Sequence, residues 1–269
     1  MSNTSKRFIS AAVLILIVGF SFVMGPWGAL SIILLLGILV FDEIEINFLK
    51  HNRNVLYYLS QGILASTFIS FFWQFTPVFA SGFRIGSIIL NLALLYYLFF
   101  TGMEAKTFLK IAKVPFLALV YTLLNFVNLG LLVKNDEWVA LLILVMLLAY
   151  GMDTGAWFFG RKFGKTQLWP SVSPKKTREG LYGGMLVAGI IGTIFYALKF
   201  GVFSPYLLVI FAMMGLISQL GDLVQSKFKR QANIKDSSAL IPGHGGVFDR
   251  LDSLIFVVPF YLVWIQLWQ

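Results

Sequence analysis

The residues best suited to chemistry are carboxylates that interrupt otherwise apolar segments. Asp153 lies within LLAYGMDTGAWFFG, and Asp222 lies within MMGLISQLGDLVQS. A charged side chain near the middle of a membrane-spanning helix costs at least about 2.5–3.5 kcal/mol on insertion scales, so each aspartate needs an offset. A bound cation or a cationic partner would supply that offset. The alternative is an aspartate at a helix end that reaches the membrane interface.

The spacing around Asp222 places four polar side chains on one face of a helix. Asp222, Gln225, Ser226 and Lys229 fall at positions i, i+3, i+4 and i+7. One anion, two neutral polar groups and one cation suit a metal ion beside a phosphate better than they suit lipid.

A second group of carboxylates flanks a glycine-rich turn. The turn is PGHGG at 242–246, where backbone amides can approach an anion closely. Asp236 precedes it, and Asp249 and Asp252 follow it, one helical turn apart. Carboxylates with few imidazoles and no thiols select hard cations such as Mg²⁺. The alternative is a structural loop that ends in a helix cap.

The two histidines are expected to differ in function. His244 in the turn is a candidate general base, although a loop histidine more often serves as a hydrogen-bonding group. Phosphate oxygens can attack without a base. His51 lies in a basic loop and is predicted to have no catalytic role.

Six basic residues crowd the segment 160–180, more than membrane orientation alone requires. They are Arg161, Lys162, Lys165, Lys175, Lys176 and Arg178. This charge beside the sequence SPKKT and the glycine pair at 183–184 suits a polyanion such as a nucleoside triphosphate. The chain has no GxxxxGK[ST] sequence, so a P-loop would not hold the triphosphate.

Membrane-spanning helices must position these groups. Of the 269 residues, 58% are hydrophobic and only 12% are charged, whereas a soluble domain carries about 25% charged residues. Nine segments approach the length of about 20 apolar residues that a span needs. They are 8–24, 28–41, 55–73, 84–101, 114–133, 138–159, 181–199, 205–226 and 253–268.

We therefore predict an all-α, polytopic integral membrane protein with about nine transmembrane helices in a single membrane domain. Residues 1–137 would form structural, lipid-facing helices, and residues 138–269 would carry the catalytic helices and loops. The first apolar segment is not followed by a small-x-small cleavage site, so we expect it to remain as the first span. The chain has no cysteine, which excludes disulfides and thiolate sites.

The basic residues predict the orientation. If the N-terminus is cytoplasmic, then 1–7, 42–54, 102–113, 160–180 and 227–252 are cytoplasmic. These segments hold all but three of the 21 Lys and Arg residues; the exceptions are Arg84, Lys134 and Lys199. This bias predicts a cytoplasmic N-terminus and an external C-terminus. It also accounts for the net charge of +9, so we expect no nucleic-acid partner.

Aromatic and basic residues would mark the two interfaces. Trp27, Trp73, Trp138 and Trp268 would form an outer aromatic belt. In 102–113, three lysines share one helical face, which predicts a helix lying on an anionic leaflet. The alternative for this segment is an ordinary connecting loop.

The segment from Ser226 to Asp252 resembles the signature of the phosphatidate cytidylyltransferases, or CDP-diacylglycerol synthases. In that pattern a serine precedes Lys-Arg, Lys-Asp, His-Gly-Gly and Asp-Arg-x-Asp at fixed spacings. The matching residues are Ser226, Lys229-Arg230, Lys235-Asp236, His244-Gly245-Gly246, Asp249-Arg250 and Asp252. The sequences DTGAWFFGRKFGK and SPKKTREG also look like blocks of this family, so the resemblance covers about 150–269.

The resemblance implies a reaction of CTP with phosphatidic acid, a membrane lipid, that gives CDP-diacylglycerol and pyrophosphate in phospholipid biosynthesis. It implies Mg²⁺ or another divalent cation as cofactor, and a bacterial inner membrane with the active site facing the cytoplasm. Metal ions and lysines would neutralise the repulsion between two anionic reactants and hold them in line. A homodimer is one assembly that these features allow.

The resemblance also implies roles for individual residues. Asp222 and Asp249 would bind metal, with Asp153, Asp236 and Asp252 as supporting ligands. Lys229, Lys235 and His244 complete the expected catalytic group. The expected substrate-binding residues are Lys165, Lys175, Lys176, Thr177, Arg230, Gly243, Gly245, Gly246 and Arg250. Gln225 replaces a glutamate that is common in the family, which puts metal binding at this position in doubt.

Three other functions compete with this one. A CTP-dependent polyprenol or dolichol kinase has related motifs but would transfer the γ-phosphate. A transporter could use Asp153 and Asp222 as an ion path, but most other acidic residues near them in sequence fall in loops. A CDP-alcohol phosphotransferase would need a different aspartate-rich motif, which this sequence lacks.

Overall fold

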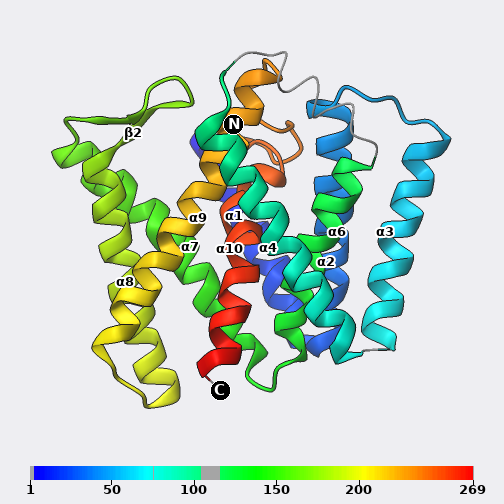
Figure 1. Ribbon diagram of the computed structural model, residues 1–269, viewed down its shortest axis with the longest axis horizontal. Helices are drawn as coiled ribbons and strands as arrows, with labels where there is room; N and C mark the ends of the chain where they lie inside the picture. Colours follow the sequence, from blue (N-terminus) through cyan, green and yellow to red (C-terminus); the bar gives the residue numbers. More distant parts are fainter. Residues whose placement is uncertain (1–2, 75, 104–115, 269) are drawn as a thin grey trace. The chain divides into compact units, whose positions relative to one another are not determined.

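The computed structural model describes residues 3–74, 76–103 and 116–268, and α-helices make up most of them (Figure 1). Within this part of the chain each of the nine predicted spans coincides with an α-helix. These helices are α1 (Asn3–Val23), α2 (Gly25–Asp42), α3 (Val55–Trp73), α4 (Pro77–Phe100), α6 (Leu117–Leu131), α7 (Trp138–Phe163), α8 (Arg178–Phe200), α9 (Pro205–Gln231) and α10 (Phe248–Trp268).

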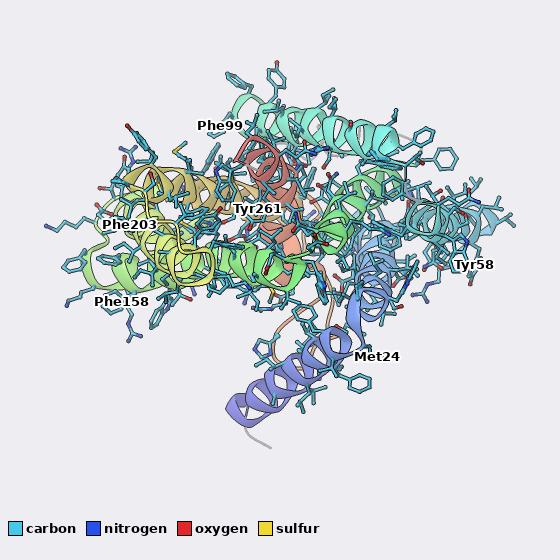
Figure 2. The ribbon with its side chains drawn as sticks, turned by 90° about the horizontal axis from the view of Figure 1, so that it is seen from below. Met24, Tyr58, Phe99, Phe158, Phe203 and Tyr261 are labelled. Carbon is cyan, nitrogen blue, oxygen red and sulfur yellow. The ribbon has the colours of Figure 1, made fainter. Side chains whose placement is uncertain are left out.

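Seven of the described helices are long and apolar enough to cross a membrane: α3, α4, α6 with the 3₁₀ turn η2 (Leu132–Lys134), and α7 to α10. In α1 the described apolar stretch Ala12–Val23 is shorter. Large apolar side chains point outward in Figure 2, for example Tyr58 and Phe158, whereas Tyr261 is enclosed. The prediction of an all-α polytopic integral membrane protein is confirmed. The lysine-bearing segment 104–113 lies outside the described residues.

The chain divides into two compact units. Unit 1 comprises Met1–Leu90, Glu104–Asp136 and Phe228–Leu251, and unit 2 comprises Asn91–Met103, Glu137–Lys227 and Asp252–Gln269. The helices α4, α9 and α10 contribute residues to both units. This division groups the segment 228–251 with the N-terminal helices, and the single domain stays a prediction.

In unit 1 the helices alternate in direction. The Trp27 ring at the start of α2 lies 6.0 Å from the Trp73 ring at the end of α3. The Lys134 ammonium of η2 lies 5.7 Å from the Trp27 ring and donates to the Phe72 carbonyl at 3.2 Å. These helix ends therefore meet at one end of the unit, as the predicted alternation of spans requires. Which side of the membrane they face stays a prediction.

In unit 2 the helices α7 and α8 approach closely because glycines line their contact. A Cβ atom on Gly155 would lie 3.0 Å from Gly184 Cα and nearer still to Val187. Small residues of this kind let helix backbones pack tightly in a membrane, where dispersion rather than water exclusion holds helices together. This packing fixes the ends of α7 and α8, between which the basic segment 160–180 is held.

That basic segment is not an irregular loop. It forms an antiparallel hairpin of β1 (Gln167–Trp169) and β2 (Ser173–Thr177). A second unpredicted element is η1, a π-helix (Glu43–Phe48) that continues α2 in unit 1. Both elements carry charged residues of the candidate site.

Lys227 shows how unit 2 holds a charge in an apolar region. Its side chain is only 1% exposed and its ammonium donates to the carbonyls of Tyr97 (2.8 Å), Leu98 (3.1 Å) and Thr101 (2.7 Å). The last carbonyls of a helix have no partner within that helix, so the C-terminal end of α4 can accept a cation. Lys227 thus anchors α9 to the end of α4 instead of lying in solvent.

Candidate active site

In unit 2, Asp222 of α9 forms an ion pair with Lys176 of β2. Both side chains are about one quarter exposed, and Ser226 Oγ donates to the second Asp222 oxygen at 3.2 Å. Side chains alternate along a strand, so Lys176 turns towards Asp222 while its neighbour Lys175 is exposed. The cationic partner that the apolar setting of Asp222 requires is therefore Lys176.

Two hydrogen-bonded groups fix the base of the hairpin. Thr177 Oγ1 accepts from the Gly180 amide at 3.1 Å and so caps the N-terminus of α8. The Glu179 carboxylate accepts from the backbone amides of Lys165 (3.1 Å) and Thr166 (3.2 Å). The Lys165 side chain itself is exposed. Of the predicted substrate residues of this segment, Lys175, Lys176 and Thr177 thus lie on strand β2, and Lys165 lies just before strand β1.

The other predicted site residues of unit 2 are buried to different extents. Asp153 of α7 is half-buried. Asp252 of α10 is buried and accepts from the Ser253 amide at 2.7 Å. Gln225 is only 1% exposed, so a glutamate at this position would also be buried.

In unit 1, Asp249 at the start of α10 is surrounded by donors. Its Oδ1 accepts from the Lys229 ammonium at 2.8 Å. Its Oδ2 accepts from the Ser237 amide (2.7 Å), the Ser237 hydroxyl (3.0 Å) and the Gly246 amide (3.0 Å). A carboxylate offers about four acceptor positions, so these donors use most of its capacity. In this arrangement Asp249 holds the segment 237–249 in shape.

Glu43 is a functional candidate that the sequence analysis missed. This carboxylate of η1 is 2% exposed. It accepts from the hydroxyls of Ser237 (2.8 Å) and Ser238 (2.7 Å), and from the amides of Val247 and Phe248 (2.8 Å each). The Phe248 amide is at the first position of α10 and the Val247 amide immediately precedes it. Donors at a helix start have no partner within the helix, and a negative charge there is favourable.

A sequence signal for Glu43 did exist. The stretch LVFDEIEINFL places acidic residues inside an apolar run, which is the same feature that pointed to Asp153 and Asp222. Glu43 and Ser237 are 194 positions apart in sequence, so only folding reveals their contact.

The glycines of the turn are required by its geometry. Gly245 has φ of +83°, a conformation that costs little only for glycine. A Cβ atom on Gly246 would overlap the Ser237 hydroxyl and lie 2.6 Å from both Glu43 carboxylate oxygens. Gly243 also has a positive φ.

His244 and Arg250 are tied to the same turn. His244 Nδ1 lies 2.8 Å from the Ser10 hydroxyl of α1, and the His244 carbonyl accepts from the Arg250 guanidinium at 2.6 and 3.0 Å. The remaining charged residues of this segment, Arg230, Lys235 and Asp236, are exposed. Exposed charged side chains therefore precede a turn whose backbone is held by the carboxylates of Glu43 and Asp249.

A divalent cation would need oxygen ligands that are not already occupied by other donors. Asp222 and Ser226 offer oxygens of the type that Mg²⁺ prefers, whereas Asp249 would have to exchange one of its donors. Among the residues that the structure describes, no three His, Cys, Asp or Glu side chains lie close enough together to hold a metal ion. The metal ligands therefore stay a prediction, with Asp222 the best fit.

Comparison with known proteins identifies relatives of the chain. The sequence model described as the cytidylyltransferase family matches residues 5–268. A phosphatidate cytidylyltransferase of Bacillus subtilis strain 168 is 46% identical over 112 residues, which cover 41% of this chain and 42% of that protein. Proteins of the same name from Staphylococcus saprophyticus and Staphylococcus aureus strain COL are each 41% identical over 126 residues, covering 46% of this chain and 48% of those proteins.

These matches confirm the resemblance to phosphatidate cytidylyltransferases that the motifs indicated. The aligned part spans somewhat less than half the length of each of these curated relatives.

Proposed function

Because the chain belongs to the cytidylyltransferase family, we propose that it transfers the cytidylyl group of CTP to phosphatidic acid. An oxygen of the lipid phosphate forms a bond to the α-phosphorus of CTP, and the bond from that phosphorus to the β-phosphate oxygen breaks. The products are CDP-diacylglycerol and pyrophosphate. The observation that carries this proposal is the family match along nearly the whole chain, with relatives that bear the name of this activity.

The hairpin of unit 2 suits the nucleotide. Both reactants are anionic, so their mutual repulsion is the main obstacle, and fixed positive charge lowers it. Lys165 and Lys175 are exposed, and together with Lys176 they would bind triphosphate oxygens. On binding, the ammonium of Lys176 would move from Asp222 to a phosphate and leave the Asp222 carboxylate available to a cation.

A divalent cation, expected to be Mg²⁺, would neutralise phosphate charge and polarise the α-phosphate when bound. Asp222 with Ser226 is the pair that we expect to hold it, because their oxygens already lie 3.2 Å apart. The buried Asp252 and the half-buried Asp153 are supporting candidates.

The turn of unit 1 suits a phosphate group. Glu43 and Asp249 bind the amides and hydroxyls at both edges of the turn, so its backbone is held before substrate arrives. Such preorganisation reduces the reorganisation needed during the reaction. The exposed Lys235 and Arg250 would add positive charge around the bound phosphate.

We further propose that these segments face the cytoplasm of a bacterial cell, where CTP is available. The distribution of Lys and Arg supports this orientation. A homodimer is one assembly in which the enzyme would act.

Labelled CTP tests the proposed reaction. Purified protein is incubated with phosphatidic acid, Mg²⁺ and CTP labelled at either the α- or the γ-phosphate. We expect the α-label in chloroform-soluble lipid and the γ-label in pyrophosphate. Transfer of the γ-label to lipid would instead assign a lipid kinase, and no labelled lipid from either substrate would rule out both activities. The variant Lys176→Met, which lacks one of the ammonium groups proposed to bind the triphosphate, is the control for loss of triphosphate binding.

A further inference from the structure

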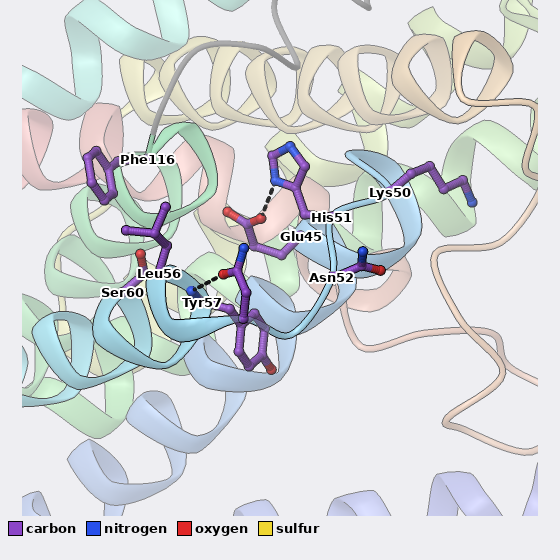
Figure 3. A pocket seen from close by; sticks show the side chains of 9 residues that line it. Glu45, Lys50, His51, Asn52, Leu56, Tyr57, Ser60 and Phe116 are labelled. Carbon is purple, nitrogen blue, oxygen red and sulfur yellow. Dashed lines mark hydrogen bonds and ion pairs between the residues drawn. The ribbon is translucent and has the colours of Figure 1, made fainter.

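Unit 1 contains a pocket of about 400 Å³ that is separate from the residues assigned to cytidylyl transfer (Figure 3). Its walls include Glu45 and His51 on one side and Leu56, Ser60 and Phe116 on the other. None of these residues belongs to the predicted catalytic or substrate-binding set. The pocket therefore needs an explanation of its own.

The pocket lies beside the first residues of two membrane spans. Leu56 is in the first turn of the membrane span α3, and Phe116 immediately precedes the span α6. Two spans that begin beside one pocket place it where the hydrocarbon core ends and the headgroup region starts. The neighbouring surface of α3 is apolar and exposed, with Val55 74%, Tyr58 60% and Leu59 55% exposed. Acyl chains can pack against such an apolar surface, whereas a water-soluble ligand gains no binding energy from it.

The pocket contains a buried carboxylate, which is paired with a histidine. Glu45 is 9% exposed, and one of its carboxylate oxygens lies 2.6 Å from His51 Nδ1. In Figure 3 the Glu45 carboxylate and the Phe116 ring lie on opposite sides of the pocket, and Lys50 also lines it. A carboxylate that faces an aromatic ring across a small pocket is suited to an ammonium group, which both attract.

The carboxylate is also held in place. Glu45 belongs to the short π-helix η1, which the four hydrogen bonds of Glu43 anchor from within the unit. Since the position of Glu45 is set before any ligand binds, less free energy is lost in ordering the site.

We propose that this pocket binds the ammonium headgroup of a zwitterionic phospholipid. The ammonium lies between Glu45 and Phe116, and the acyl chains follow the exposed side of α3. A phospholipid whose headgroup is only anionic would bring its phosphate against the Glu45 carboxylate. The pocket is therefore a second lipid site and not the site of phosphatidic acid.

A binding experiment tests this site independently of cytidylyl transfer. The full chain is purified in detergent micelles and titrated with dihexanoyl phosphatidylethanolamine or, in parallel, dihexanoyl phosphatidylglycerol, while the thermal unfolding midpoint is recorded. A ligand that binds the folded state raises this midpoint with concentration. We expect a saturable rise with the ethanolamine lipid and little or none with the glycerol lipid. Equal responses to the two lipids, or no response to either, overturn the proposal.

Variants locate the binding. Glu45→Gln is expected to weaken binding by about tenfold or more, the effect of losing a hydrogen bond between charged groups. Phe116→Leu should weaken it by a few-fold, the size of a cation–π contribution. Glu137→Gln removes a carboxylate that pairs with Lys199 in unit 2 and should leave the affinity unchanged. If Glu45→Gln does not fold, the variant Ser60→Leu, whose larger side chain fills the pocket, replaces it as the test. Unchanged affinity for the ethanolamine lipid in Ser60→Leu overturns the proposed site.

Discussion

The substitution Glu43→Gln tests whether a buried carboxylate holds the glycine-rich turn. Glu43 accepts four hydrogen bonds, two from hydroxyls and two from amides at the start of α10. Glutamine keeps the shape but offers one acceptor oxygen and places an NH₂ group, itself a donor, against the remaining donors. About two of the four bonds are therefore lost.

The magnitude follows from those bonds. Hydrogen bonds to a charged group contribute about 1.5 kcal/mol or more each, so two lost bonds amount to about 3 kcal/mol. This is smaller than the typical stability of about 5–15 kcal/mol, so the protein should remain folded. The turn, however, should open locally, with a rise of about 100-fold in the open fraction.

Hydrogen exchange and turnover are the two measurements. Amides of the segment 237–248 should exchange about 100-fold faster in Glu43→Gln, and formation of CDP-diacylglycerol should fall strongly while the helical content stays unchanged. Glu45→Gln is the matched control for exchange, because it changes the same group two positions away on η1 without contacting the turn. Unchanged exchange of 237–248 in Glu43→Gln would refute the role given to this carboxylate.

Three further predictions concern the metal, the orientation and position 225. Activity should vanish with a chelator and return with Mg²⁺. Asp222→Asn should lower turnover at least about 100-fold, the size of losing a major electrostatic stabiliser. Full activity after metal removal would contradict the metal requirement and the role of Asp222 as a metal ligand. Single cysteines at Gln167 and Ala232, in a chain that has none, should resist a membrane-impermeant thiol reagent in intact cells and react after permeabilisation; reaction in intact cells would reverse the orientation. Gln225→Glu should lower the Mg²⁺ concentration for half-maximal activity if this position contacts the metal, whereas an unchanged midpoint with reduced turnover would limit Gln225 to hydrogen bonding.

The helices themselves could be predicted well from the sequence. A span must satisfy its backbone hydrogen bonds internally and present apolar side chains to lipid, so its length and composition are visible along the chain. The ranges 55–73 and 205–226, for example, coincide with α3 and with most of α9. The motif around the glycine turn was equally visible, because its residue types stand close together in sequence.

The tertiary structure decided which charges meet. Local spacing predicts faces of a helix, but the partner of a buried charge can come from anywhere in the chain. Asp222 pairs with Lys176, 46 positions away, only because the basic segment folds into a hairpin. The strand alternation that selects Lys176 over Lys175 was not predicted, since six basic residues in a polar segment suggest a loop.

The sequence by itself determined the membrane helices, the family resemblance and the residues able to handle phosphates, since these depend on composition and short-range spacing. Only the tertiary structure revealed Glu43 as the support of the glycine turn, Lys227 as an anchor on the end of α4, and the pocket beside Glu45. Each depends on contacts between segments distant in sequence. The reason is physical: a buried charge is stable only where donors or acceptors converge on it, and that convergence is a property of the folded chain.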